Sequence, residues 1–248
     1  MNPFKKNKKQ LSIFITAGFP SLESTTTQIL ELQSRGVDFI EVGIPFSDPM
    51  ADGEVIQMAS AIALKNGMNL QLLFDQLLSM QLQIKVPIVL MGYLNPILQF
   101  GMKNFLEKCK SLNISSVIIP DLSLEIYERY YQSLFEKYDM PITFLITPEV
   151  SNERVKEIAI KCKKSFVYLV SKTSITGGVD SKFDSQKDYL RIKSFCSEVP
   201  IMMGFGISTK KDVEQVYKYC DGAIIGSAFI KSILDKRDLI SEICADVN

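Results

Sequence analysis

Residues 37–53 read VDFIEVGIPFSDPMADG, and the fold prediction starts from this stretch. It begins with an almost uninterrupted apolar run, 37–42, and continues into a loop rich in Pro, Ser, Asp and Gly. A short apolar run of this kind is typical of a strand with both faces buried in a parallel sheet. The amphipathic stretch Leu22–Arg35 before it favours a helix.

The same alternation of strand and helix recurs along the whole chain. The predicted strands are Leu11–Thr16, Val37–Val42, Val86–Met91, Ser116–Pro120, Ile142–Thr147, Phe166–Ser171, Ile201–Gly204 and Gly222–Ile225. The helical candidates include Leu22–Arg35, Leu70–Gln83, Met102–Leu112, Leu124–Tyr138, Asn152–Lys163 and Lys210–Tyr219. About eight such units predict an α/β fold, a single (β/α)8 TIM barrel domain over residues 1–248. A doubly wound open sheet is the alternative.

Polar residues collect where the predicted strands end. In a parallel barrel these ends form one rim, where the loops that carry chemistry are found. The residues in question are Thr16, Glu41, Tyr93, Asn95, Asp121, Thr147, Lys172, Gly206, Gly226 and Ser227. The pattern so far predicts a barrel enzyme without specifying its reaction.

Composition limits the kinds of chemistry and partner. The formal net charge is +0, which gives no reason to expect nucleic acid or an anionic membrane as partner. No segment has the roughly 20 apolar residues of a membrane span. Five cysteines, an odd number without a C-x-x-C pair, fit reduced thiols in a cytoplasmic protein. We expect the lysine run of Lys5, Lys6, Lys8 and Lys9 to be a solvated, frayed end.

The chain contains no histidine. This excludes a Ser-His-Asp triad, a Cys-His pair and histidine-based metal sites, and we expect no metal. An acid–base enzyme of this composition must move protons with Asp, Glu, Tyr, Lys or Cys.

The run from Glu41 to Gly53, E-x-G-x-P-F-S-D-P-x-A-D-G, resembles the tryptophan synthase alpha chain family. The resemblance covers nearly the whole chain; other matching segments are 16–20, 93–96, 171–177, 204–208 and 226–228. It implies a carbon–carbon lyase of tryptophan biosynthesis, which cleaves indole-3-glycerol phosphate to indole and glyceraldehyde 3-phosphate by a retro-aldol reaction. It also implies no cofactor in this chain.

The resemblance assigns the two catalytic roles to Glu41 and Asp52. Glu41 lies near the end of an apolar strand, where burial is expected to raise its pKa into the range useful for proton transfer. Asp52, on the following loop, can stay ionised and accept a hydrogen bond from the indole N–H. The structural alternatives are an ion pair of Glu41 with a lysine and a simple turn at Asp52.

The substrate's two ends call for different surroundings. For the phosphate, close approach of backbone N–H groups and a helix N-terminus is expected at Thr176, Gly177, Phe205, Gly206, Gly226 and Ser227. For the indole, the family pattern implies an apolar slot of Phe14, Met91, Ile118, Ile146, Tyr168 and Phe205. Without the resemblance, these residues are ordinary glycine turns and barrel core.

The resemblance also implies a partner. The family's alpha chain docks on a pyridoxal-phosphate-dependent beta chain in an α2β2 heterotetramer, and the matching docking residues are Pro45, Asp48, Asn95 and Pro96. Residues from Lys172 to about Phe183 are expected to close over the substrate, or to form a merely flexible surface loop.

Several features depart from the family pattern. Only about ten residues precede the first strand, where the family has a helix, and Ser123, Glu149 and Ser174 replace its usual residues in three loops. An alternative function is therefore a weakly active or inactive member that mainly activates the beta chain. A third is another barrel of tryptophan biosynthesis, such as indoleglycerol-phosphate synthase, which the long motif disfavours.

Overall fold

The computed structural model describes residues 2–171 and 186–244. Its strands pair in the order β5-β4-β3-β2-β1-β9-β8-β7-β6, and every pairing with a determined register is parallel. The chain divides into two compact units, residues 15–143 and residues 1–14 with 144–248, which are described separately. The single domain over 1–248 stays a prediction.

The unit of residues 15–143 contains four complete strands and the helices from α1 to α7. The strands are β2 (Phe39–Gly43), β3 (Ile88–Met91), β4 (Ser116–Ile118) and β5 (Ile142–Thr143). The helices are α1 (Ser24–Ser34), α2 (Glu54–Lys65), α3 (Leu70–Ser79), α4 (Leu94–Phe100), α5 (Met102–Ser111), α6 (Leu124–Ile126), the π-helix η1 (Tyr127–Tyr131) and α7 (Gln132–Lys137). Each strand is buried along its length, as the apolar sequences predicted.

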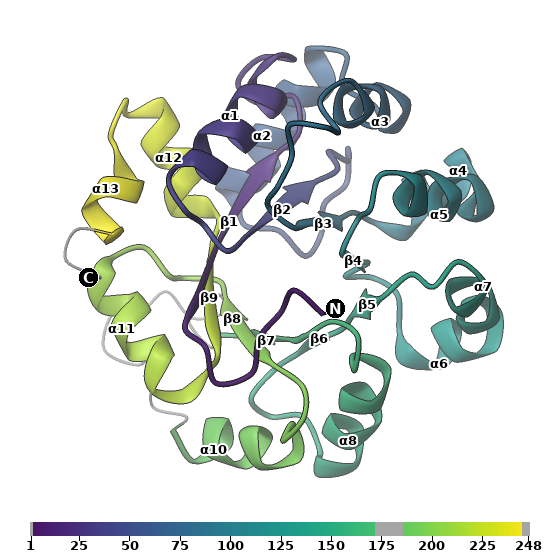
Figure 1. The fold of residues 1–248 in the computed structure, drawn as a ribbon, viewed down its shortest axis with the longest axis vertical. Coiled ribbons are helices and arrows are strands. Elements are labelled where there is room, and N and C mark those ends of the chain that lie inside the picture. The colour runs from purple at the N-terminus through teal and green to yellow at the C-terminus, as the bar shows by residue number, and fades with distance from the viewer. Residues whose placement is uncertain (1, 172–185, 245–248) are drawn as a thin grey trace. The chain divides into compact units, whose positions relative to one another are not determined.

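The other unit contains the second half of the chain and the start of the first strand. Its strands are β6 (Leu145–Ile146), β7 (Val167–Val170), β8 (Ile201–Gly204) and β9 (Gly222–Ile225), and β1 (Gln10–Thr16) begins here and pairs with β9. Its helices are α8 (Asn152–Lys161), α10 (Gln186–Phe195), α11 (Lys210–Tyr219), α12 (Ser227–Leu234) and α13 (Leu239–Cys244). Figure 1 shows α8, α10 and α11 on one side of strands β6 to β9.

Prolines and a break move several predicted strand ends. Strand β3 starts at Ile88, because Pro87 before it has no N–H to donate, and its carbonyl accepts instead from Ile40 N at 3.0 Å. The predicted strand Ile142–Thr147 is interrupted at Phe144, although the Phe144 carbonyl still accepts from Tyr168 N at 3.0 Å. The predicted strands therefore exist. Several are shorter than predicted, whereas β1 begins one residue earlier and β2 ends one residue later.

Side-chain caps explain where several helices begin. Asn69 accepts from Leu72 N at 3.0 Å ahead of α3. Thr209 and Asp212 form a reciprocal capping box at the start of α11. The predicted helix Leu124–Tyr138 is observed with a π-helical turn in its middle. Helices α2, α4, α10 and α13 were not assigned from the sequence.

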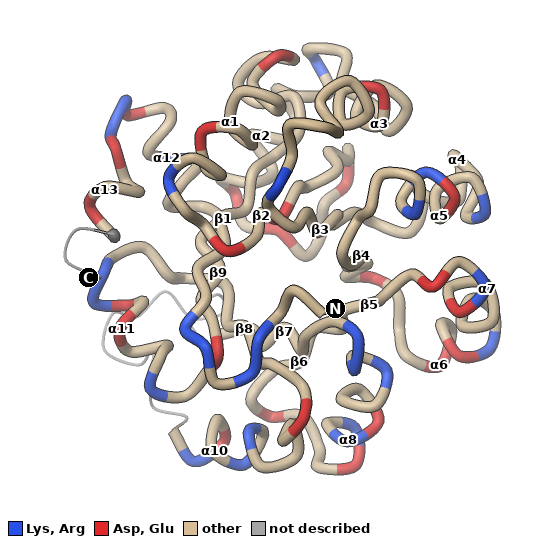
Figure 2. The backbone as a smooth tube through the Cα atoms, in the orientation of Figure 1, with Lys and Arg blue, Asp and Glu red and all other residues tan. Residues whose placement is uncertain are grey.

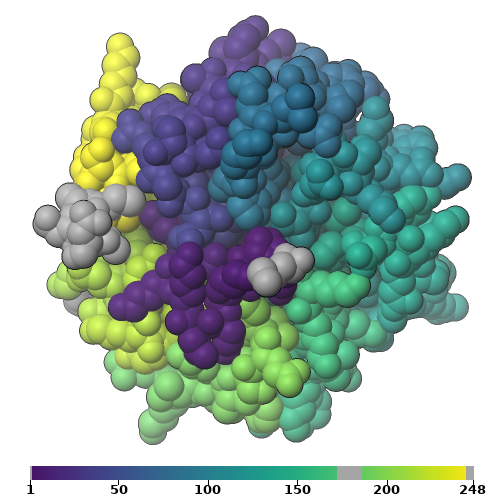
Figure 3. Space-filling view, in the orientation of Figure 1, coloured from purple at the N-terminus to yellow at the C-terminus, as the bar shows by residue number. Residues whose placement is uncertain are grey.

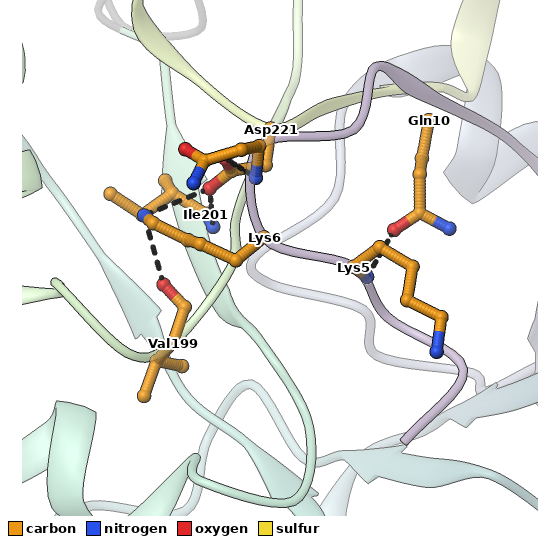
Figure 4. Close-up of polar contacts among 7 residues, drawn as sticks. Lys5, Lys6, Gln10, Val199, Ile201 and Asp221 are labelled. Atoms are coloured by element: carbon orange, nitrogen blue, oxygen red, sulfur yellow. Dashed lines mark hydrogen bonds and ion pairs between the residues drawn. The ribbon is translucent and has the colours of Figure 1, made fainter. Parts of the chain in front are cut away.

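The N-terminal lysine segment is not a frayed end. Lys6 Nζ pairs with Asp221 Oδ2 at 3.0 Å and donates to the Val199 carbonyl at 3.2 Å, as Figure 4 shows. Asp221 is buried, and it also accepts from the backbone N–H groups of Asn7 and Ile201 at 2.8 and 2.9 Å. The prediction was wrong because it treated the lysines as a surface run, whereas a buried carboxylate anchors one of them.

Apolar packing holds the same segment further upstream. Phe4 is only 3% exposed and meets the ring of Phe166 edge-on at 4.8 Å. Asn2 Nδ2 donates to the Ser165 carbonyl at 3.3 Å. Figure 2 shows the lysines of this segment in blue, and in Figure 3 its purple residues lie against green residues of the same unit. The chain therefore packs before β1 without a helix there.

No helix within the described ranges 2–171 and 186–244 is long and apolar enough to cross a bilayer. The cysteines whose side chains are described are all buried free thiols: Cys109, Cys162, Cys196 and Cys220.

Candidate active site

Glu41 is a buried carboxyl in the middle of strand β2. Its register partner on β3 is Val89, and the next pair is Val42 with Leu90, so its strand neighbours are apolar. Glu41 is 1% exposed, and its Oε1 atom has no hydrogen-bond partner among the described residues. Burial, and secondly the charge of Asp52, raise its pKa from 4.5 to about 8. The expected burial and raised pKa are thus observed.

The structural alternative for Glu41 was an ion pair with a lysine. No ion pair involving Glu41 is found among residues 2–171 and 186–244. Burial of a carboxyl without a nearby cation favours its protonated form. At neutral pH Glu41 is therefore protonated and can act as a proton donor.

Asp52 is half-buried in the loop that joins β2 to α2. A turn places it there: Asp52 N donates to the Pro49 carbonyl at 3.0 Å, and the Asp52 carbonyl accepts from Gln57 Nε2 at 2.8 Å. Burial raises the pKa of Asp52 to about 6, and a hydrogen bond from Tyr93 opposes that rise. At pH 7 Asp52 is then mostly ionised, while Glu41 is mostly protonated.

The sequence places Tyr93 after the third predicted strand but indicates no role for it. Tyr93 Oη lies 3.1 Å from Asp52 Oδ2 and 2.9 Å from Ala51 N. The contact depends on the course of the loop around Ala51, which no spacing rule reveals. Glu41, Asp52 and Tyr93 therefore form one electrostatic cluster in the unit of residues 15–143.

In the other unit, Tyr168 on β7 and Phe205 after β8 are brought together. Their rings meet edge to face with centroids 5.9 Å apart. Gly204 makes room for this pair, since a Cβ at that position would lie 2.0 Å from Tyr168 Oη. Phe205 adopts φ +68°, a left-handed conformation unusual for a non-glycine residue, and Ser171 Oγ donates to its carbonyl at 2.6 Å. The Ser171 hydroxyl thus holds the turn at residues 205–206 in its left-handed conformation.

A second turn in this unit leads into a helix. Gly226 is the N-cap of α12, which begins at Ser227, in agreement with the helix N-terminus expected at these two residues. Phe14 Cβ lies 3.5 Å from the position that a Cβ on Gly226 would take. The first turn of α12 presents backbone N–H groups that the helix itself does not use, an arrangement suited to an anion.

The other predicted substrate residues are strand residues. Met91 and Ile118 are register partners on β3 and β4, and Ile146 pairs with Leu169 across β6 and β7. All the apolar candidates except Phe205 are buried: Phe14, Met91, Ile118, Ile146 and Tyr168. Their burial fits core packing as well as a binding slot. Thr176 and Gly177, with the whole of the expected closing loop from Lys172 to about Phe183, lie outside the described residues.

The predicted docking residues differ in exposure. Asp48 and Asn95 are exposed and Pro96 is partly exposed, whereas Pro45 is buried in this chain alone. Met50, in the same loop as Asp48, is 91% exposed. Pro45 consequently offers little surface of its own.

Two of the substituted loop residues that depart from the family pattern lie within the described residues. Ser123 caps α6, where its Oγ accepts from Ile126 N at 3.3 Å. Glu149 lies exposed in a turn whose Pro148 carbonyl accepts from Arg191 Nη2 at 2.7 Å. The third, Ser174, lies outside the described residues.

This chain is similar to known proteins of one family along almost its entire length. The family model described as tryptophan synthase alpha chain matches residues 2–247. The chain belongs to the tryptophan synthase alpha chain family. Among its relatives, the alpha chain of Phocaeicola vulgatus is 48% identical, with 97% of this chain and 93% of that one covered. That of Flavobacterium johnsoniae is 46% identical, with 92% and 90% covered.

Solved structures of this family support the fold. The tryptophan synthase subunit alpha of Campylobacter jejuni is 32% identical and has a TM-score of 0.81, with 97% of this chain and 96% of that one covered. That of Legionella pneumophila is 33% identical with a TM-score of 0.83, covering 96% and 89%. The family likeness and the parallel strand order confirm the predicted (β/α)8 barrel class.

Proposed function

We propose that this chain is the lyase subunit of a tryptophan synthase, which cleaves indole-3-glycerol phosphate to indole and glyceraldehyde 3-phosphate. In this retro-aldol reaction indole C3 gains a proton, the adjacent side-chain hydroxyl loses one, and the carbon–carbon bond between them breaks. The observation that carries the proposal is the buried Glu41 carboxyl, whose pKa is raised to about 8 within the family motif.

Glu41 is proposed to move both protons. At neutral pH it is protonated, so it can donate to indole C3 as general acid. The carboxylate that remains is buried and strongly basic, and it takes the proton of the substrate hydroxyl as the carbon–carbon bond breaks. The two transfers return Glu41 to its starting state, so no cofactor in this chain is needed for the proton balance.

Asp52 is proposed to act as a fixed anion. Positive charge develops on the indole ring when C3 is protonated, and an ionised carboxylate accepting from the indole N–H stabilises that charge. Its pKa of about 6 keeps it ionised under the conditions in which Glu41 is protonated. Two carboxyls in unlike surroundings thus divide the work between them.

The substrate's remaining parts are assigned to residues of the motifs. We assign the phosphate to the backbone at Gly206, Gly226 and Ser227, with Thr176 and Gly177, and the left-handed turn at Phe205 and the start of α12 support this. We assign the indole ring to the apolar residues Phe14, Met91, Ile118, Ile146, Tyr168 and Phe205.

We further propose that the chain works with a pyridoxal-phosphate-dependent beta chain in an α2β2 complex in the cytoplasm, and that the cofactor belongs to the partner. Family membership supports the partner, and a crystal structure of tryptophan synthase from M. tuberculosis is similar to this chain with a TM-score of 0.84. The exposed Asp48 and Asn95, with Pro96 and the backbone at Pro45, are the docking residues we propose.

The test is Glu41→Gln in the complex with a purified beta chain, with two reactions measured on one sample. We expect indole-3-glycerol phosphate cleavage to be abolished, while synthesis of tryptophan from serine and indole stays activated. Glu198→Gln, an exposed change of the same type, should leave both reactions unchanged. If the native chain activates the beta chain but cleaves no substrate, the alternative of a pure activator is correct.

A further inference from the structure

Tyr93 is tied to both the backbone and the carboxylate of the Asp52 loop. Its hydroxyl accepts from Ala51 N at 2.9 Å and lies 3.1 Å from Asp52 Oδ2. Because the backbone N–H is the donor to the phenol oxygen, the hydroxyl proton is left for the carboxylate. One phenol oxygen therefore determines where Asp52 Oδ2 lies relative to its own loop.

The phenol ring is itself held firmly. Tyr93 is 6% exposed and its ring packs on that of Phe46 with centroids 5.3 Å apart. On one side Gly92 N donates to the Ile118 carbonyl at 3.0 Å, and on the other Leu94 N donates to Asp121 Oδ1 at 2.9 Å. Tyr93 is thus held by its ring and by the backbone N–H groups of both neighbouring residues.

The charged groups that act on Tyr93 are carboxyls. They are Asp52 itself and Asp121 from the loop after β4, and the charge of Asp52 also acts on Glu41 from β2. Burial and the charge of Asp52 raise the pKa of Tyr93 well above its usual range. The phenol therefore keeps its proton, and remains a donor, at every pH at which the lyase would work.

We propose that Tyr93 is a positioning residue of the lyase reaction, whose hydroxyl holds Asp52 Oδ2 and leaves Oδ1 for the indole N–H. No described side chain donates to Oδ1, which fits this division. The inference rests on the proposed function of Asp52. A bond to the ionised form favours ionisation, so the hydroxyl also keeps Asp52 an anion despite its burial.

Tyr93→Phe tests the role by kinetics across pH in the complex with the beta chain. We expect kcat to fall about ten- to a hundredfold with little change in KM, since the lost group acts on charge that develops in the transition state. The acidic limb of the profile, set near pH 6 by Asp52, should move up by about one pH unit. A purely structural role would lower the rate equally at all pH values.

Tyr138→Phe is the matched control, because it also removes a tyrosine–carboxylate hydrogen bond, that from Tyr138 Oη to Glu107 Oε1 at 2.7 Å, but on an exposed surface. We expect it to leave the profile unchanged. In an Asp52→Asn background, Tyr93→Phe should cause no further loss. If the two changes are instead additive, or if the acidic limb of Tyr93→Phe stays in place, the inference is wrong.

A measurement without turnover separates this inference from the proposed function. Carbon-13 NMR of labelled aspartate carboxyls follows the titration of Asp52 directly, with its signal assigned by its loss in Asp52→Asn. We expect Tyr93→Phe to raise the pKa of Asp52 whether or not the chain cleaves substrate. An unchanged titration refutes the Tyr93 contact, whereas a shifted titration with no cleavage by the native chain refutes the lyase function.

Discussion

Replacing Glu41 with Gln should make the stability of the folded chain less dependent on pH, so that the variant gains stability relative to the native chain as pH rises. The folded state holds the Glu41 proton with a pKa of about 8, against 4.5 in the unfolded chain. Between these values the unfolded state carries fewer protons, so native stability falls as pH rises, and the penalty is complete only above pH 8. Gln cannot ionise and escapes this penalty.

The size of this stability difference follows from the interval between the folded and unfolded pKa values of Glu41. Each pH unit between the two pKa values costs about 1.36 kcal/mol, slightly less near pH 5, where the unfolded carboxyl is not fully ionised. From pH 5 to pH 7 the stability advantage of Glu41→Gln over the native chain should grow by about 2.5 kcal/mol. Comparing two pH values removes the constant cost of burying an amide.

The assay is urea unfolding followed by circular dichroism, with native chain and variant at both pH values. Glu198→Gln, a change of the same type at an exposed position, serves as control. An advantage of Glu41→Gln that is the same at pH 5 and pH 7 would show that this carboxyl ionises normally. The proton-transfer role proposed for Glu41 would then lose its physical basis.

Three further outcomes test other parts of the structure. Lys6→Met should lower the free energy of unfolding by about 2 kcal/mol in urea titrations, because it leaves the buried Asp221 without its cation. Gly204→Ala should destabilise by about 1–3 kcal/mol on thermal unfolding, since its Cβ would overlap Tyr168; a neutral result would mean that the ring is free to move. Asp52→Asn should lower kcat/KM for substrate cleavage, with a loss of about 3 kcal/mol in transition-state stabilisation. A native kcat/KM in steady-state kinetics would contradict the role of Asp52 as a stabilising anion.

The sequence was most informative where one local property decides the structure. Apolar runs located the strands, and the position of Glu41 within such a run correctly predicted its burial and raised pKa. The glycine before Ser227 likewise marked the start of a helix. These features depend on a few neighbouring residues, so they are visible without coordinates.

Features that depend on distant partners could not be predicted. The contact between Tyr93 and Asp52 joins residues 41 positions apart through the path of a loop. The anchoring of Lys6 requires a carboxylate 215 positions away, whose burial at the start of β9 no sequence pattern indicates. The interruption at Phe144 also has no marker, because the surrounding residues are as strand-like as those of any other strand.

The anchored N-terminus has a practical consequence for handling the protein. Residues 2–7 supply an aromatic ring to the core, a cation to a buried acid and a backbone donor to the same acid. Trimming the chain back to its first strand, a common choice when no helix precedes it, would expose Phe166 and leave Asp221 facing solvent. Shortened versions used for crystallisation or fusion should therefore keep every residue from Asn2 onward.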